Sequence, residues 1–162
     1  MKFSTNREIL LKAVQLVTGV VERRQTLPVL SNLLVTAEEA EGSEGGRVSL
    51  VGTDLEVELI ARVQGVQVEQ AGSATIPARK LADIWRSLPE GAEVSVAIEG
   101  DRAIVRSGRS RFALATLPAA EFPEITTQDG DVELSMPYAR VRRLLDQTSF
   151  AMAQQDVRFF LN

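Results

Sequence analysis

The sequence predicts a fold in which amphipathic helices accompany antiparallel sheets, and a repeated order of elements is the main observation behind this prediction. Three segments, beginning near Phe3, Thr75 and Leu134, share the order of a short strand, a helix start and an amphipathic helix. After the first two helices, apolar and polar residues alternate as they do in strands with one buried face. The repeated unit is therefore one strand, one helix and about three strands.

Each predicted helix has an apolar stripe at the i, i+3, i+4 spacing of one buried helical face. The helix starts are also marked. Thr5 and Glu8 have the spacing of a capping box, while Pro77 and Pro137 stand where proline suits a first helical turn. The stripes are Leu10, Ala13, Val14 and Val17; Leu81, Ile84, Trp85 and Leu88; and Val141, Leu144 and Leu145.

Two groups of antiparallel strands are predicted after these helices. In the first, residues 54–59 alternate carboxylates with apolar side chains, which predicts a strand with one wet and one buried face. In the second, apolar residues at 94–98, 104–105 and 112–114 are separated by turn residues at 99–101 and 107–108. This second group is a three-stranded meander.

Turn-forming residues divide the chain after the second repeat. Pro118, Phe122-Pro123 and Asp129-Gly130-Asp131 suggest a linker, which predicts one domain over 1–125 and the beginning of a second, incomplete domain over 126–162. The third unit has its helix and the start of a strand at 157–161, without the partner strands that complete a sheet. We therefore expect the chain to be part of a longer protein.

The composition excludes several kinds of chemistry. The chain has no His and no Cys, so thiolate nucleophiles, imidazole bases and the usual zinc ligands are lacking, and we expect no metal or cofactor. The net charge of −4 argues against strong sequence-independent binding to phosphates, because such affinity comes from clustered Lys and Arg. Any role on DNA would therefore have to rest on local patches of positive charge or on topology.

The sequence also bears on location. Its first residues have no signal-like apolar run, and no stretch is long and apolar enough for a bilayer. We expect a soluble, cytoplasmic protein that makes no contact with a membrane.

Six stretches follow the motifs of one known family, in the family's order: residues 26–34 (TLPVLSNLL), 52–56 (GTDLE), 77–80 (PARK), 88–92 (LPEGA), 105–112 (VRSGRSRF) and 156–162 (DVRFFLN). With them the chain resembles the bacterial DNA polymerase III beta sliding clamps. The resemblance implies an α+β fold rather than α/β: the DNA-clamp fold, with antiparallel sheets outside and helices lining a pore.

The same resemblance implies a function. A complete subunit would have three similar domains, and two subunits would close head to tail as a homodimeric ring around double-stranded DNA. Such a ring is a non-catalytic processivity factor of the replicative DNA polymerase. A clamp-loader ATPase and DNA polymerases are the implied protein partners. A single domain cannot close a ring, so we expect this chain alone to bind DNA weakly and in a salt-sensitive way.

Cations on the helices are the first candidates for DNA contacts. Arg79 and Arg86 lie nearly opposite the apolar stripe of their helix, and Lys12 and Arg143 occupy similar faces elsewhere. The resemblance implies that these faces look into the pore and touch phosphates loosely, often through water. The alternative is a polar face that only keeps each helix soluble. Carboxylates lie on the same side, at Glu8, Asp83 and Asp146.

Loop residues supply further candidates by resemblance. Arg24, in a polar turn, and Gln155, before the final strand, match DNA-contacting positions of the family. For Arg24 the alternative is an ordinary surface arginine. Phe159 and Phe160 stand where some relatives carry tyrosines that contact single-stranded template, so base stacking could persist without the hydroxyl hydrogen bonds. Core packing is the alternative for both, and we favour it for Phe160.

A ring-closing surface is implied by the same family match. An apolar centre rimmed by cations suits a subunit interface. Core membership is the alternative for its apolar members. The residues are Lys80, Ile84, Arg109, Arg111, Phe112 and Leu114.

Two functions of other classes stay open. Asp54, Glu56 and Glu58 on one strand face could bind Mg²⁺ or Mn²⁺, which would suit a carboxylate-dependent enzyme acting on nucleic acid. A solvated strand face explains the same pattern. The second alternative is a generic interaction module without a role on DNA, which charge reversal at the candidate arginines would distinguish.

Overall fold

The computed structural model describes residues 1–21, 27–39, 45–123 and 134–153. The chain divides into two compact units, residues 1–125 and 126–162, which are described separately. Across the described ranges, no helix is long and apolar enough to cross a membrane.

The first unit contains two repeats of strand, helix and three strands, which confirms the predicted order. Short 3-10 turns occur at Pro28–Ser31 and Ala119–Glu121. The first repeat consists of β1 (Lys2–Asn6), α1 (Arg7–Thr18), β2 (Asn32–Glu38), β3 (Gly46–Thr53) and β4 (Glu58–Gln70). The second consists of β5 (Gly72–Pro77), α2 (Ala78–Ser87), β6 (Glu93–Glu99), β7 (Arg102–Ser107) and β8 (Ser110–Ala115).

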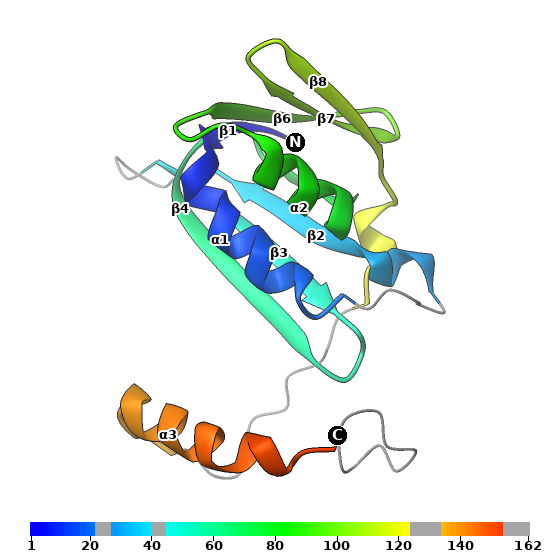
Figure 1. The fold of residues 1–162 in the computed structure, drawn as a ribbon. Coiled ribbons are helices and arrows are strands. Elements are labelled where there is room, and N and C mark those ends of the chain that lie inside the picture. The colour runs from blue at the N-terminus through cyan, green and yellow to red at the C-terminus, as the bar shows by residue number, and fades with distance from the viewer. Residues whose placement is uncertain (22–26, 40–44, 124–133, 154–162) are drawn as a thin grey trace. The chain divides into compact units, whose positions relative to one another are not determined.

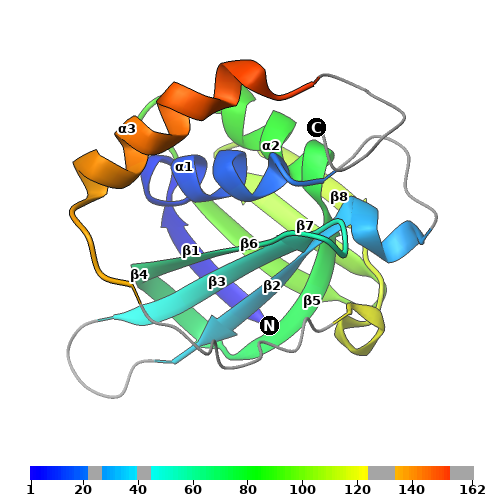
Figure 2. The ribbon, with the colours of Figure 1, turned by 90° about the horizontal axis from the view of Figure 1, so that it is seen from below.

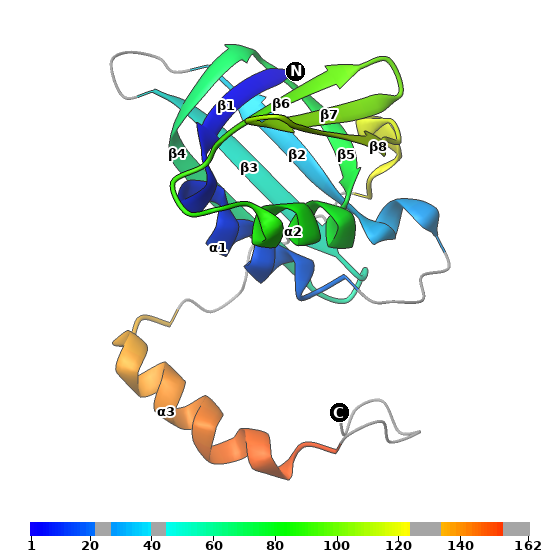
Figure 3. The same cartoon turned by 45° about the horizontal axis from the view of Figure 1, so that its top comes forward.

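The strands form one antiparallel sheet of eight, in the order β5-β2-β3-β4-β1-β6-β7-β8. The first strand of each repeat joins the meander of the other repeat, because β1 pairs with β6 and β5 pairs with β2. The curved sheet brings its two ends together at a bridge between Thr75 and Leu117 (Figure 3). The two repeats are thus interwoven in one domain.

Helices α1 and α2 lie side by side on one face of this sheet (Figures 1 and 2). Both predicted apolar stripes are buried, and they join Phe3 and other strand residues in the main core.

The cap of α1 differs from the prediction. Asn6, rather than Thr5, caps the helix by accepting a hydrogen bond from the Glu8 N–H at 3.1 Å. Thr5 is buried on the core side of β1.

The strand predicted over residues 54–59 was wrong at its beginning, because residues 54–57 form the turn between β3 and β4. The Asp54 carboxylate accepts the N–H groups of Glu56 and Val57 at 2.9 and 2.7 Å. Leu55 takes a positive φ of 81°, and its side chain is exposed. Local side-chain bonding therefore prevailed over the alternating pattern.

The second unit contains helix α3 (Tyr138–Thr148) and a 3-10 turn at Ser149–Ala151. The helix was predicted, and Pro137 directly precedes it. The strand expected near Leu134 is not found at residues 134–137, and the strand expected at 157–161 lies outside the described residues. The third apolar stripe (Val141, Leu144 and Leu145) is exposed among the described residues.

Candidate nucleic-acid interface

The helices α1 and α2 run antiparallel and are joined by an arginine at each end. Arg7, the first residue of α1, donates from Nε to the Trp85 carbonyl near the end of α2, at 3.0 Å. Arg79, in the first turn of α2, donates from Nη2 to the Val21 carbonyl beyond the end of α1, at 2.8 Å. Each cation thus meets main-chain carbonyls at the negative end of the other helix.

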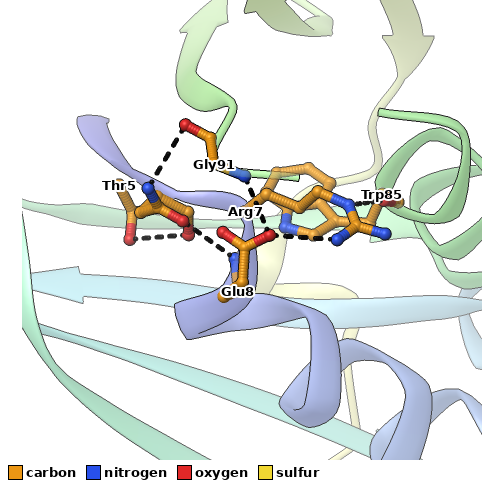
Figure 4. Close-up of polar contacts among 6 residues, drawn as sticks. Thr5, Arg7, Glu8, Trp85 and Gly91 are labelled. Atoms are coloured by element: carbon orange, nitrogen blue, oxygen red, sulfur yellow. Dashed lines mark hydrogen bonds and ion pairs between the residues drawn. The ribbon is translucent and has the colours of Figure 1, made fainter. Parts of the chain in front are cut away.

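The Arg7 end of the helix pair is a connected network (Figure 4). Arg7 Nη1 pairs with Glu8 Oε1 at 3.0 Å, and the same carboxylate oxygen accepts the Gly91 N–H at 3.1 Å. The Gly91 N–H, the N–H of Glu8 itself and the Arg7 guanidinium hold the pKa of Glu8 below its ordinary value. The start of α1 is therefore anchored to the loop that follows α2.

The outward faces of α1 and α2 carry the predicted cations. Arg79 and Arg86 are seven residues apart, about two helical turns, and both side chains are exposed opposite the buried stripe. Lys12 is exposed on α1 in the same way. The structure therefore brings Lys12, Arg79 and Arg86 to the solvent side of one helix pair.

These cations differ in their partners. Arg86 pairs with Asp83 at 3.0 Å, and Arg79 is tied to Val21. Lys12 makes no ion pair within the described part of the chain. The candidate DNA face of the two helices has an excess of one positive charge, on a chain with net charge −4. Its exposed charges are Lys12, Arg79 and Arg86 against Glu8 and Asp83.

The remaining candidate DNA residues lie elsewhere. Arg143 is exposed on α3, in the second unit. Arg24 and Gln155 lie outside the described residues, as do Phe159 and Phe160.

The candidate subunit surface combines residues of α2 and of the edge strand β8. Ile84 and Leu114 are 7% exposed and belong to the core, with Phe112 half-buried against it. The expected apolar centre is therefore largely buried in the core of this unit, and Phe112 is more exposed than Ile84 and Leu114. Its cations are exposed: Lys80, Arg109 and Arg111.

The candidate metal site is not assembled. Asp54 binds the main chain of its own turn, and the described ranges contain no cluster of three or more His, Cys, Asp or Glu that could hold a metal ion. The three carboxylates proposed for Mg²⁺ or Mn²⁺ also do not lie on one strand face, because only Glu58 belongs to β4.

Two contacts that hold the helix pair together could not be predicted from the sequence. The Arg7 bond to Trp85 joins residues 78 apart in the chain, and the Arg79 bond to Val21 joins residues 58 apart. Arginine in a first helical turn carries no sign of such a distant partner. The repeat offered one signal, since each arginine lies in the first turn of the helix of its unit.

Comparison with known proteins relates this arrangement to one family. The family described as DNA polymerase III beta subunit, N-terminal domain, matches residues 1–126. The beta sliding clamps of Proteus mirabilis and Escherichia coli are each 52% identical to the chain over all 162 residues. The chain spans 42% and 43% of the lengths of these two relatives.

Solved structures give the same relation. The DNA polymerase III beta subunit of Pseudomonas aeruginosa superposes with a TM-score of 0.87 at 51% identity, covering all of this chain and 42% of that one. A sliding clamp from Bartonella birtlesii gives a TM-score of 0.89 at 34% identity, with the same two coverages of 100% and 42%. Both superpositions cover the whole chain and therefore the fold described above.

Proposed function

The chain belongs to the DNA polymerase III beta subunit family, and from this premise we propose that its protein is a DNA sliding clamp. In this proposal the protein encircles duplex DNA and serves the replicative polymerase as a non-catalytic processivity factor. The proposal rests on one observation. Helices α1 and α2 present an exposed cationic face, and their opposite face is buried against the sheet.

Two free strand edges support a ring-building role. Within the described part of the first unit, the stretch 58–65 of β4 pairs only with β3, and β8 pairs only with β7. Free edges offer unpaired main-chain groups to another strand. Head-to-tail assembly needs two different surfaces on each building block, and these two edges meet that requirement. We place the subunit interface at β8 and α2, with Phe112 at its centre and Lys80, Arg109 and Arg111 at its rim.

The charge distribution favours retention by topology over tight binding. The outward helix face has a small positive excess, whereas affinity for phosphates requires many clustered cations. We assign the loose phosphate contacts to Lys12, Arg79, Arg86 and Arg143 on the helices and to Arg24 and Gln155 in the loops. A homodimeric ring would then need a clamp-loader ATPase to open it, and polymerases would dock on it in the cytoplasm.

Retention on circular DNA tests this function. The full-length protein is placed on nicked circular DNA by a clamp loader, the free protein is removed, and the DNA is cut once. A clamp stays on the intact circle and leaves the cut molecule, because escape then needs only sliding past an end. Equal loss from both forms would refute the proposal. Charge reversal at Arg24, Arg79 and Arg86 should weaken the salt-sensitive binding of the protein to duplex DNA, whereas a module without a DNA role would be unaffected.

A further inference from the structure

An acidic residue stands among the cations of the DNA-facing helix surface. Asp83 Oδ1 lies 3.0 Å from Arg86 Nη1, one turn apart on α2, with side chains 71% and 54% exposed. Both point away from the buried stripe. Under the proposed function, the Arg86 guanidinium would attract a DNA phosphate, but it is paired with the Asp83 carboxylate, which would repel the phosphate.

A similar pair occurs on the helix of the second unit, where it uses Arg142 and not the candidate phosphate contact Arg143. Arg142 and Asp146 form an i,i+4 pair at 3.7 Å, again with exposed side chains. The carboxylate of α1 is used differently. Glu8 is turned towards Arg7 and the Gly91 N–H, and Lys12, four residues later, has no ion-pair partner within the described ranges. Two of the three helices therefore carry an exposed acid bound to their own cation.

Such exposed pairs contribute little to folding, because solvent screens them and ordering two long side chains is costly. They matter more where a third charge approaches. A phosphate near Arg86 must compete with Asp83 for the guanidinium and is repelled by the carboxylate within a Debye length of about 8 Å at physiological salt. A ring held by topology needs no lasting contact here, and a lasting contact would oppose sliding.

We propose that Asp83 is a mobility-determining residue, which keeps Arg86 from forming a persistent phosphate contact so that duplex DNA passes the helices with low friction. The inference rests on the proposed function and adds to it a property, sliding mobility, that encirclement alone does not fix.

Asp83→Asn in the full-length protein tests the inference, and Asp101→Asn is the matched control. Asp101 is also an exposed aspartate beside an arginine, Arg102 at 3.9 Å, and it lies in the turn between β6 and β7. Both variants change the net charge equally. Binding to duplex DNA is measured against salt concentration, and diffusion of loaded protein is followed on stretched DNA. Thermal unfolding confirms that both variants are folded.

One additional phosphate contact steepens the slope of log affinity against log salt by about 0.9. Asp83→Asn should therefore add a roughly 3.5-fold loss of affinity between about 50 and about 200 mM salt, and its diffusion should slow. Asp101→Asn should change neither quantity. In an Arg86→Gln background, the effect of Asp83→Asn should largely disappear, since the released guanidinium is then absent.

Two results would overturn the inference. One is an equal effect of Asp83→Asn and Asp101→Asn, which would indicate net charge alone. The other is an undiminished effect of Asp83→Asn in the Arg86→Gln background, which would exclude the guanidinium. Failure of the sliding-clamp function itself is recognised separately, because the unchanged protein would then leave circular and cut DNA equally fast.

Discussion

Replacing Arg7 by alanine should weaken the anchored pair of helices that presents the proposed DNA-facing surface. The Arg7 side chain is 14% exposed and donates to the carbonyl of Trp85, which is 1% exposed. A hydrogen bond from a charged group contributes about 1.5–3 kcal/mol. The ion pair with Glu8, whose side chain is 48% exposed, is screened by solvent and adds little. We expect Arg7→Ala to lower the free energy of unfolding by about 2–3 kcal/mol.

Urea unfolding followed by tryptophan fluorescence measures this loss. Trp85 is the chain's single tryptophan and lies in the affected helix pair. Arg47→Ala is the control, because Arg47 pairs with Glu38 on the sheet surface, with side chains 49% and 47% exposed. Its loss should stay below about 1 kcal/mol. If Arg7→Ala costs no more than Arg47→Ala, the anchoring role assigned to Arg7 is wrong.

Three further substitutions test the local structure. Glu8→Gln should reduce the fall in the free energy of unfolding at acid pH. Because the pKa of Glu8 is lowered in the folded protein, its carboxylate stabilises the fold above the unfolded pKa of about 4.3, and this stabilisation is lost as pH falls through the folded pKa. Unfolding at stepped pH checks this, and an unchanged profile would contradict it. Asp54→Ala should cost about 1 kcal/mol, because two N–H groups lose their acceptor, whereas Glu56→Ala should stay within about 0.5 kcal/mol in the same denaturation assay. Gly52→Ala would place a Cβ 2.9 Å from Val17 Cγ1 and 3.0 Å from the Val17 carbonyl oxygen. The free energy of unfolding should therefore fall by about 1–3 kcal/mol, as measured by thermal unfolding. An unchanged melting temperature would mean that α1 can move away from β3.

The periodic parts of the fold could be predicted from the sequence. Apolar stripes identified α1 and α2 and their buried faces, because helix geometry repeats independently of distant contacts. The meander of β6, β7 and β8 followed from alternation and glycine turns. The exposure of Lys12, Arg79 and Arg86 followed from the same helix geometry.

The errors arose where side chains bond to the main chain. The alternation around Leu55 resembles a strand, but the Thr53 hydroxyl and the Asp54 carboxylate hold a turn there. Thr5 matched a capping box, yet β1 continues through it and the cap falls on Asn6. In both places a hydrogen bond of one side chain decides the outcome, and the hydrophobic pattern does not record it.

Parts of the candidate site also depended on tertiary structure. Alternation placed Phe112 and Leu114 on one face of a strand, but it could not show that Leu114 is almost fully covered by its own domain. Charge counting likewise could not distinguish Lys12 from Arg86, because the ion pair between Arg86 and Asp83 is a feature of the three-dimensional structure. Partner choice among surface charges is set by rotamers and distances, which composition does not contain.

Encirclement would hold the protein on any DNA whose ends it cannot pass. Release of the loaded, full-length protein can therefore be compared between linear duplexes that differ only at their ends. One duplex has free ends, and on the other both ends are blocked by tightly bound bulky proteins. An encircling clamp should be lost rapidly from free ends and retained between blocked ends, with little dependence on salt in the second case. Equal release from both duplexes would contradict encirclement.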